Sequence, residues 1–215
     1  MKLEEFRKLL EKPYLFHLHT RYTDGHLEVE DYFCFAQEHG VETIFFTEHV
    51  RRELKYDFSA FAAEIRVVAT RYPGIRGVVG AEAKILPGGD LDIHSNTFDE
   101  IDVLCFACHG FPDDDVLYFD SFRKLLGDER WKSKIRVFVH PGRYLKKRHI
   151  EDAERWDKLE ELLAFGMENG VFIEDNRREY LPKHPEKIPG ASKVIGYDIH
   201  QPRDLERWLS EQGNG

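Results

Sequence analysis

The chain has 215 residues, of which 41% are apolar and 33% carry a charge, a composition typical of one folded domain with a substantial core. The formal net charge of −9 argues against a long groove for nucleic acid, because such a groove needs a broad basic face. Residues 1–12 are charged and amphipathic, and the three cysteines lie inside apolar segments. We therefore expect a single domain over residues 1–215, located in the cytoplasm, with neither a signal peptide nor a membrane span.

Strand and helix patterns alternate along the chain. In order, they predict a helix over residues 2–12, a strand over 14–19, a helix over 28–39, a strand over 41–47, a helix over 58–72, a strand over 77–83, an outlying hairpin over 85–93, a strand over 101–108, a helix over 116–126, a strand over 135–139, a helix over 153–169, strands over 171–174 and 194–198, and a helix over 202–210. The proline-rich residues 177–192 are not expected to hold a full helix. Such alternation predicts a parallel sheet with right-handed crossovers.

The stretch from Phe16 to His26, FHLHTRYTDGH, ends an apolar run with two histidines two residues apart. Positions i and i+2 of a strand face the same side, so His17 and His19 would project toward one point. Asp24 adds a carboxylate from the following loop. Taken alone, this pair is as compatible with solvent-facing or core histidines as with a metal site.

Other ligand-type residues close further apolar runs, at His49, Glu82, His109, His140, Asp198 and His200. Ligand-type side chains at the end of every strand favour a closed or nearly closed barrel of seven units. An open sheet would instead concentrate its site at the one point where the strand order reverses. Nine imidazoles and carboxylates are too many for one ion, so we expect two or three divalent ions. This donor set fits zinc, manganese or iron better than calcium or magnesium, and such centres activate water and stabilise charge on a phosphoryl group. The spacing of Cys105 and Cys108 also occurs in redox and zinc motifs, but their apolar surroundings favour packing.

These motifs resemble those of the PHP family, named after bacterial polymerases and histidinol phosphatase. The family's HxHTxxSDG element corresponds to residues 17–25 and its T-D-H element to residues 47–49. The third-strand carboxylate, two single histidines and a terminal DxH then follow in the family's order, at Glu82, His109, His140 and residues 198–200. The resemblance spans nearly the whole chain. It implies an α/β fold, a distorted (β/α)7, TIM-like barrel with a trinuclear centre at the carboxyl-terminal ends of the strands.

The resemblance also implies how the ligands divide. The sets are His17, His19, Glu82 and Asp198 for one ion, Glu82, His109 and His140 for a second, and Asp24, His49 and His200 for a third. Two positions depart from the family pattern. Glu48 stands where the family often has aspartate, and Asp24 where the histidinol phosphatases have histidine.

Further residues are assigned from their places near these motifs. Glu174 closes the sixth strand and is expected to orient a ligand or a water molecule. Basic groups follow three strands, and together they favour an anionic substrate over a merely solvated surface. We expect Arg51, Arg143 and Arg177 to bind the substrate phosphate, with Arg143 as the best candidate for a bidentate grip. The residues expected to take part in catalysis are Arg143, Glu174, Asp198 and His200.

The leading hypothesis is a metal-dependent phosphoesterase in which a metal-bound hydroxide attacks a small-molecule phosphomonoester. Its partner is then a small phosphorylated substrate, while the general acid and the oligomeric state are left open. Three alternatives remain. The first is a phosphodiesterase or exonuclease acting on short oligonucleotides. The second is a non-catalytic metal-binding PHP module, and the third is an amidohydrolase-like metal barrel that cleaves carbon–nitrogen bonds.

Overall fold

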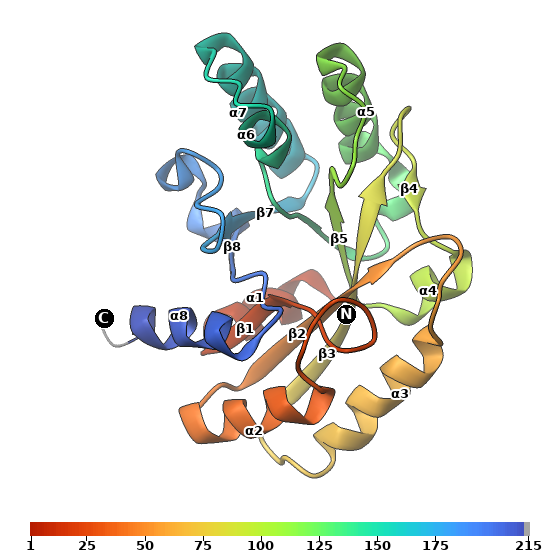
Figure 1. Cartoon of the computed structure of the whole chain (residues 1–215), viewed down its shortest axis with the longest axis vertical. Helices are drawn as coiled ribbons and strands as arrows, with labels where there is room; N and C mark the ends of the chain where they lie inside the picture. The colour runs from red at the N-terminus through yellow and green to blue at the C-terminus, as the bar shows by residue number, and fades with distance from the viewer. Residues whose placement is uncertain (213–215) are drawn as a thin grey trace.

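The computed structural model describes residues 1–212, and its helices and strands alternate as expected (Figure 1). The elements are α1 (Leu3–Leu10), β1 (Tyr14–Leu18), α2 (Val29–His39), β2 (Thr43–Val50), α3 (Phe58–Ala69), β3 (Arg76–Ile85), β4 (Leu91–Asp92), α4 (Ser95–Glu100), β5 (Val103–Ala107), α5 (Asp115–Gly127), β6 (Ile135–Phe138), α6 (Arg143–Lys147), α7 (Ala153–Glu168), β7 (Val171–Asn176), β8 (Lys193–Gly196) and α8 (Pro202–Gln212). Short 3-10 turns lie at Glu129–Trp131, Pro185–Lys187 and Gly190–Ser192. No full helix lies between β7 and β8 in this described part of the chain, as expected.

Within residues 1–212, seven parallel strands follow the order β1-β2-β3-β5-β6-β7-β8. The short β4 pairs antiparallel with the end of β3, outside this path, as the predicted hairpin requires. Residues after β8 return to β1, because Ile199 N donates to His17 O at 2.9 Å and His19 N donates to Ile199 O at 2.9 Å. The structure therefore confirms a nearly closed, distorted (β/α)7 barrel.

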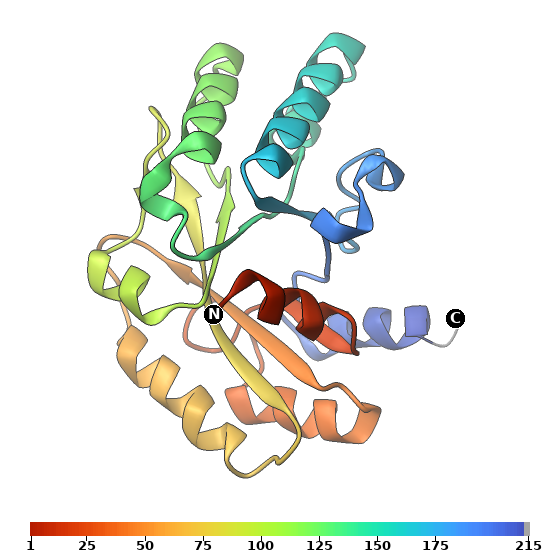
Figure 2. The same cartoon turned by 180° about the vertical axis from the view of Figure 1, so that it is seen from behind.

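Two apolar layers flank the strands. A large cluster fills the space between the strands and the surrounding helices, and a smaller one fills the interior of the barrel. Phe6 of α1 belongs to the interior cluster and packs edge-on against Phe45 and Phe172, at centroid distances of 5.4 and 4.9 Å. Helix α1 thereby closes the amino-terminal end of the barrel, on the side that faces the viewer in Figure 2. Cys105 and Cys108 are free, buried and in different layers, consistent with packing.

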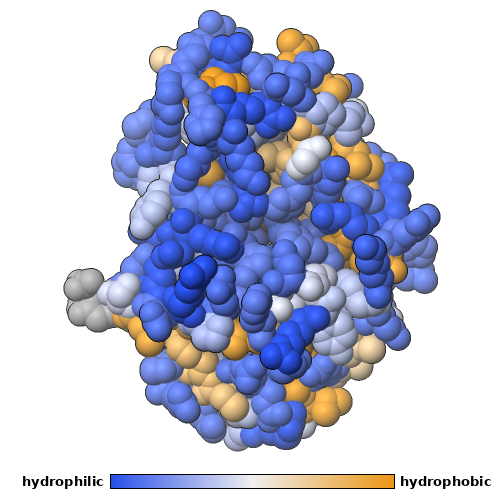
Figure 3. Space-filling view, viewed as in Figure 1, coloured by the Kyte–Doolittle hydropathy of each residue, from blue (hydrophilic) through white to orange (hydrophobic). Residues whose placement is uncertain are grey.

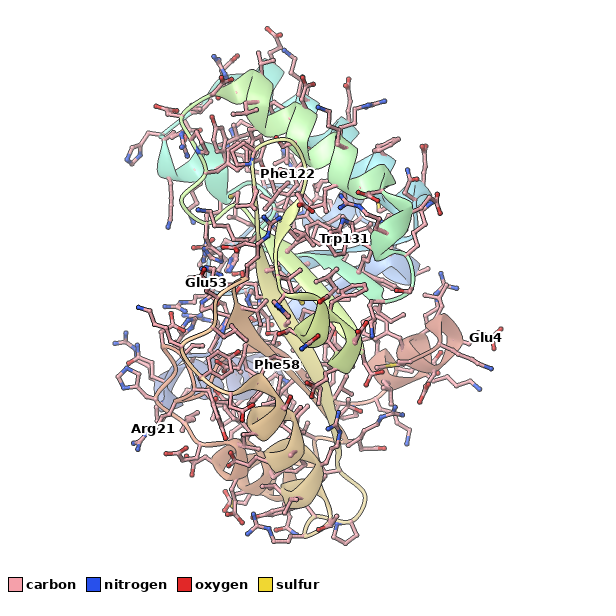
Figure 4. All side chains as sticks on the ribbon, turned by 90° about the vertical axis from the view of Figure 1, so that its right-hand side faces the viewer. Glu4, Arg21, Glu53, Phe58, Phe122 and Trp131 are labelled. Carbon is pink, nitrogen blue, oxygen red and sulfur yellow. The ribbon has the colours of Figure 1, made fainter. Side chains whose placement is uncertain are left out.

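The opposite end of the barrel is polar. Figure 3 shows hydrophilic side chains over the centre of the face that carries the carboxyl ends of the strands. In the side view of Figure 4, Glu4 of α1 lies at one end of the molecule, whereas Arg21 and Glu53 lie at the other. Arg21 and Glu53 belong to the loops that follow β1 and β2. The side chains predicted to bind metal come from these strand ends and loops. None of the helices described in residues 1–212 combines the length and the apolar character needed to cross a bilayer.

The element boundaries differ from the sequence predictions at places that matter for the site. Strands β2 and β7 extend further than predicted, so that His49 lies within a strand rather than after it and Glu174 no longer ends its strand. The sequence patterns do not predict α4 and α6, which span six and five residues. Helices this short contain less than two turns and show no full amphipathic period. Helix α6 begins at Arg143, one of the predicted site residues.

Candidate metal centre

His17 and His19 converge through an irregularity in β1. The pairing of β1 with β2 shifts register between Phe16 and Leu18, and His17 has a φ of +64°. Leu15 and Leu18 consequently both face the outer apolar layer, which a regular alternation would forbid. The sequence predicted the convergence correctly, but it assumed an ordinary strand.

Two more candidate ligands have left-handed backbones, His140 with a φ of +52° and Asp198 with a φ of +48°. Residues other than glycine rarely adopt this conformation, and each instance costs about 1–3 kcal/mol. Such strain concentrates at functional sites, where the surrounding structure holds it in place. His140 and Asp198 each lie two residues after the end of a strand, where the unusual backbone turns the side chain toward the mouth of the barrel.

Four candidate ligands form a cage. The Nε2 atoms of His17 and His19 both lie 3.5 Å from Glu82 Oε2 and 3.5 Å from Asp198 Oδ1. These contacts are long for hydrogen bonds, but donor atoms about 2.1 Å from a tetrahedral ion lie about 3.4 Å from one another. His17 Nε2, His19 Nε2 and Glu82 Oε2 are buried without a hydrogen-bond partner among the described residues. Their geometry therefore fits a shared cation.

The other candidates adjoin this cage. Glu82 Oε1 lies 2.6 Å from His109 Nε2 and 3.6 Å from His140 Nε2. The Asp24 carboxylate lies 3.5 Å from His49 Nε2 and 3.4 Å from His200 Nε2. The structure thus brings together all nine residues predicted as ligands, namely His17, His19, Asp24, His49, Glu82, His109, His140, Asp198 and His200, and each belongs to a group of three or four whose donor atoms lie within 4.8 Å.

Charges at the site suit cation binding. Burial alone would raise the pKa of Glu82 and of Asp198, but neighbouring histidines, above all His109 for Glu82 and His17 for Asp198, hold both pKa values well below the usual range. Burial and the charge of His49 lower the pKa of His19 to about 3. Despite burial, neighbouring carboxylates raise the pKa of His17 through Glu174 and that of His49 through Glu82, the latter to about 10. Because metals bind ionised carboxylates and neutral imidazoles, a cation would displace protons from these two histidines.

Glu174 forms hydrogen bonds with two of the histidines, His17 and His140. Its side chain is fully buried, accepts a hydrogen bond from His17 Nδ1 at 2.5 Å and accepts another from the backbone N of His140 at 2.7 Å. A histidine that donates through Nδ1 can offer Nε2 to a metal ion, and Nε2 of His17 points into the cage. The carboxylate lies tightly against Gly196, since a Cβ there would be 1.9 Å from Glu174 Oε1.

Of the arginines predicted to bind phosphate, the structure brings one to the centre. Arg143 Nη1 lies 3.1 Å from His109 Nδ1, and its Nη2 lies 3.4 Å from Asp198 Oδ2. Arg51 instead lies 3.7 Å from Asp92. Arg177 turns outward to Asp175 and Glu211, at 3.2 and 3.6 Å. The structure therefore does not place Arg51 or Arg177 beside the candidate ligands.

Three residues at the centre were missing from the sequence prediction of site residues. Arg178 Nη1 lies 3.1 Å from Asp198 Oδ2 and 2.7 Å from His200 Nδ1. Glu179 accepts from Arg143 Nε at 2.8 Å and lies 3.3 Å from His140 Nδ1. Glu48 accepts from the backbone of Thr20 and from the Thr23 hydroxyl, and so holds the loop that carries Asp24. The only sequence signal for Arg178 and Glu179 is their place after β7.

We expect Zn²⁺ or Mn²⁺ to stabilise the EDTA-treated protein against heat. A ligand present at 100 times its dissociation constant stabilises the folded state by about 2.7 kcal/mol, which corresponds to a rise in Tm of about 5–10 °C. Differential scanning fluorimetry measures this shift, and Mg²⁺ serves as the control because imidazoles bind it weakly. Equal Tm values with and without Zn²⁺ and Mn²⁺ would contradict a metal centre.

The fold also occurs in solved structures. A histidinol phosphate phosphatase from Lactococcus lactis, solved with zinc, L-histidinol and phosphate, aligns with a TM-score of 0.65 and 15% identity over 94% of this chain and 93% of its own. A two-domain protein from Bacteroides vulgatus containing a predicted PHP-like metal-dependent phosphoesterase aligns with a TM-score of 0.54 and 20% identity, over 93% of this chain and 55% of its own. A structure described as amidohydrolase II aligns with a TM-score of 0.51 and 13% identity, over 93% of this chain and 91% of its own. At these identities the likeness concerns the fold alone.

Sequence comparison identifies the family. None of the curated proteins compared with the chain matches it. The family model of the PHP domain, in contrast, matches residues 16–188, which include the end of the first strand and the candidate ligands from His17 to His140. The chain belongs to the PHP domain family.

Proposed function

We propose that this chain is a metal-dependent phosphoric ester hydrolase that acts on small-molecule phosphomonoesters. The observation that supports it most is the cage of His17, His19, Glu82 and Asp198, whose nitrogen and oxygen atoms are spaced at 3.5 Å and lie beside two arginines. Two or three ions of zinc, manganese or iron fit the imidazole and carboxylate donors, with Glu82 shared between sites. Bound divalent ions supply Lewis acidity, which lowers the pKa of water and polarises phosphoryl oxygens.

The protein's own residues divide the remaining work. Asp198 completes the cage from the segment after β8, His200 lies beside Asp24, and Glu174 fixes the ring of His17. Arg143 and Arg178 each place a guanidinium nitrogen within 3.4 Å of Asp198 Oδ2, so positive charge borders the carboxylate cluster. Guanidinium groups match phosphoryl oxygens in geometry and stabilise charge that develops on them. We assign phosphate binding to Arg143 and Arg178, in place of Arg51 and Arg177.

Glu179 prepares Arg143 for this role. Both Glu179 oxygens accept from Arg143 Nε, at 2.9 and 2.8 Å, and one lies 2.7 Å from Nη2. The guanidinium is only 11% exposed, so its plane is fixed before a substrate arrives. Preorganised donors of this kind cost little reorganisation during the reaction. Nη1, which faces His109, is the nitrogen left without a carboxylate partner among the described residues.

The small size of the expected substrate follows from two features. The chain is acidic overall, with a net charge of −9, so the basic residues at the site do not extend into a broad positive surface. In addition, the structurally similar enzyme from Lactococcus lactis is named for histidinol phosphate, a small phosphomonoester. This similarity supports the substrate class rather than a specific substrate.

The test is hydrolysis of para-nitrophenyl phosphate compared with its bis ester by protein that has been stripped with EDTA and reloaded with Zn²⁺ or Mn²⁺. We expect the monoester to give a kcat/KM at least about tenfold higher, and EDTA to abolish the activity. The His109→Ala variant, prepared in parallel, controls for contaminating phosphatases. Cleavage of the diester alone would favour a phosphodiesterase. Metal binding without hydrolysis in a broad phosphoester panel would favour a non-catalytic module.

A further inference from the structure

Lys84 follows Glu82, the shared carboxylate of the centre, by two residues on β3. Along β3, Val78 belongs to the interior layer and Glu82 to the centre, whereas Ala83 and Ile85 belong to the outer layer. The alternation of the strand therefore makes Lys84 the next inward position after Glu82, at the mouth of the barrel. Its amino group reaches the residue after His109, because a Cβ at Gly110 would lie 3.7 Å from Lys84 Nζ.

The amino group of Lys84 has no partner within the protein. Over residues 1–212, Nζ makes no hydrogen bond, no ion pair and no contact with an aromatic ring, although the side chain is half-buried and Asp92 stands opposite Lys84 in the β3–β4 pairing. The neighbouring Arg51 and Arg52 on the same rim, in contrast, pair with Asp92 and Asp90. Removing an ammonium from water without a partner is unfavourable. An unpaired half-buried amine in a chain with more acidic than basic residues is therefore suited to an anion from outside.

We propose that Lys84 binds a phosphoryl oxygen of the substrate and makes the site selective for phosphomonoester dianions over diesters. This inference rests on the proposed phosphoesterase function. Arg143 approaches His109 at Nδ1, whereas Lys84 Nζ lies near the backbone of Gly110, so both cations lie beside the segment of residues 109–110. A monoester dianion presents three terminal oxygens that share two negative charges to such a pair, whereas a diester has one negative charge and a carbon group on the third oxygen. A compact ammonium with three donors favours the dianion.

The direct test is binding of inorganic phosphate and of dimethyl phosphate to the zinc-loaded protein, measured by isothermal titration calorimetry. In Lys84→Met we expect the Kd for phosphate to rise about tenfold and the Kd for dimethyl phosphate to change less than about twofold. Lys84→Arg should retain most of the phosphate affinity. Lys8→Met serves as the matched control, because it removes the same charge from exposed α1 at the other end of the barrel. Elemental analysis should find equal zinc in all variants.

Kinetics provide the second readout. For Lys84→Met, the KM for para-nitrophenyl phosphate should rise about tenfold, with a smaller effect on kcat and no effect on the bis ester. Should Lys84→Met fold poorly, Lys84→Gln replaces it. The role of Lys84 would be overturned if Lys84→Met and Lys84→Gln bound phosphate as tightly as the wild type, or if the wild type bound no phosphate. If phosphate binding depends on Lys84 but no ester is hydrolysed, the proposed function fails while the binding role of Lys84 stands.

Discussion

Replacing Glu82 by glutamine is expected to empty the metal centre and to lower phosphomonoesterase kcat/KM by at least about 10³-fold. Glu82 is the carboxylate on which the sites depend. Its Oε2 lies 3.5 Å from both His17 Nε2 and His19 Nε2 and 3.0 Å from His49 Nδ1, while Oε1 lies 2.6 Å from His109 Nε2. Glutamine keeps the shape of the side chain but removes the charge, so the clustered imidazoles lose their shared anion.

Elemental analysis of the purified variant and a phosphate-release assay measure the two effects. Glu42→Gln is the matched control, because Glu42 undergoes the same chemical change in an exposed ion pair with Lys12, 2.5 Å away. Circular dichroism should show the same secondary structure in both variants, since Glu82→Gln alters no apolar contact. A Glu82→Gln protein that keeps its full metal content and turns over within tenfold of the wild type would refute the shared role of Glu82.

Gly196→Ala should weaken metal binding, although Gly196 is not itself a candidate ligand. The added Cβ would lie 1.9 Å from Glu174 Oε1, and Glu174 is fully buried. The carboxylate must therefore shift, and this shift disrupts its hydrogen bonds with His17 Nδ1 and with the backbone N of His140. Loss of such a supporting contact lowers metal affinity about 10–100-fold, and overpacking costs about 1–3 kcal/mol.

Competition with a zinc chelator measures the affinity, and thermal unfolding measures the stability. Gly190→Ala is the control, because a Cβ at that position meets nothing within 4 Å. Glu174→Gln separates the two effects, since it weakens the support of His17 without overpacking. We expect it to lose metal affinity while its Tm falls less than that of Gly196→Ala. Zinc affinity in Gly196→Ala equal to that of the wild type would show that Glu174 does not position the centre.

The barrel and its candidate ligands were predictable from sequence because both follow from local patterns. Apolar runs mark the strands, and residues such as Glu82 and His140 stand where those runs end. Parallel strands bring their carboxyl ends to one side, so a correct strand assignment already places the ligand-type side chains together. No long-range information is needed for this step.

The irregularity at His17 depends on contacts that no local pattern contains. His17 O accepts a hydrogen bond from Ile199 N, and β1 also pairs with β2, so the backbone at His17 must satisfy partners from both ends of the chain. The alternation of side chains along residues 14–19 carries no information about these backbone pairings. The sequence therefore predicts which residues meet, but not the backbone conformation that makes them meet.

The choice between Arg177 and Arg178 illustrates a second limit. The two residues are adjacent in the loop after β7, yet Arg177 faces Asp175 and Glu211 while Arg178 faces Asp198 and His200. A loop has no fixed alternation of side-chain direction, so sequence alone cannot decide which arginine turns inward. Lys84, in contrast, lies on a strand, where its inward direction follows from the position of Glu82.

The proposed cations also have a structural role at the seam of the barrel, where β1 meets the segment after β8. His17 and His19 come from the first strand, whereas Asp198 and His200 come from the segment that closes the barrel behind the last strand. A cation held by His17, His19 and Asp198 would join the beginning of the barrel to its end. Loss of the cation would then weaken this junction, so the centre that carries out the chemistry would also help to keep the barrel closed.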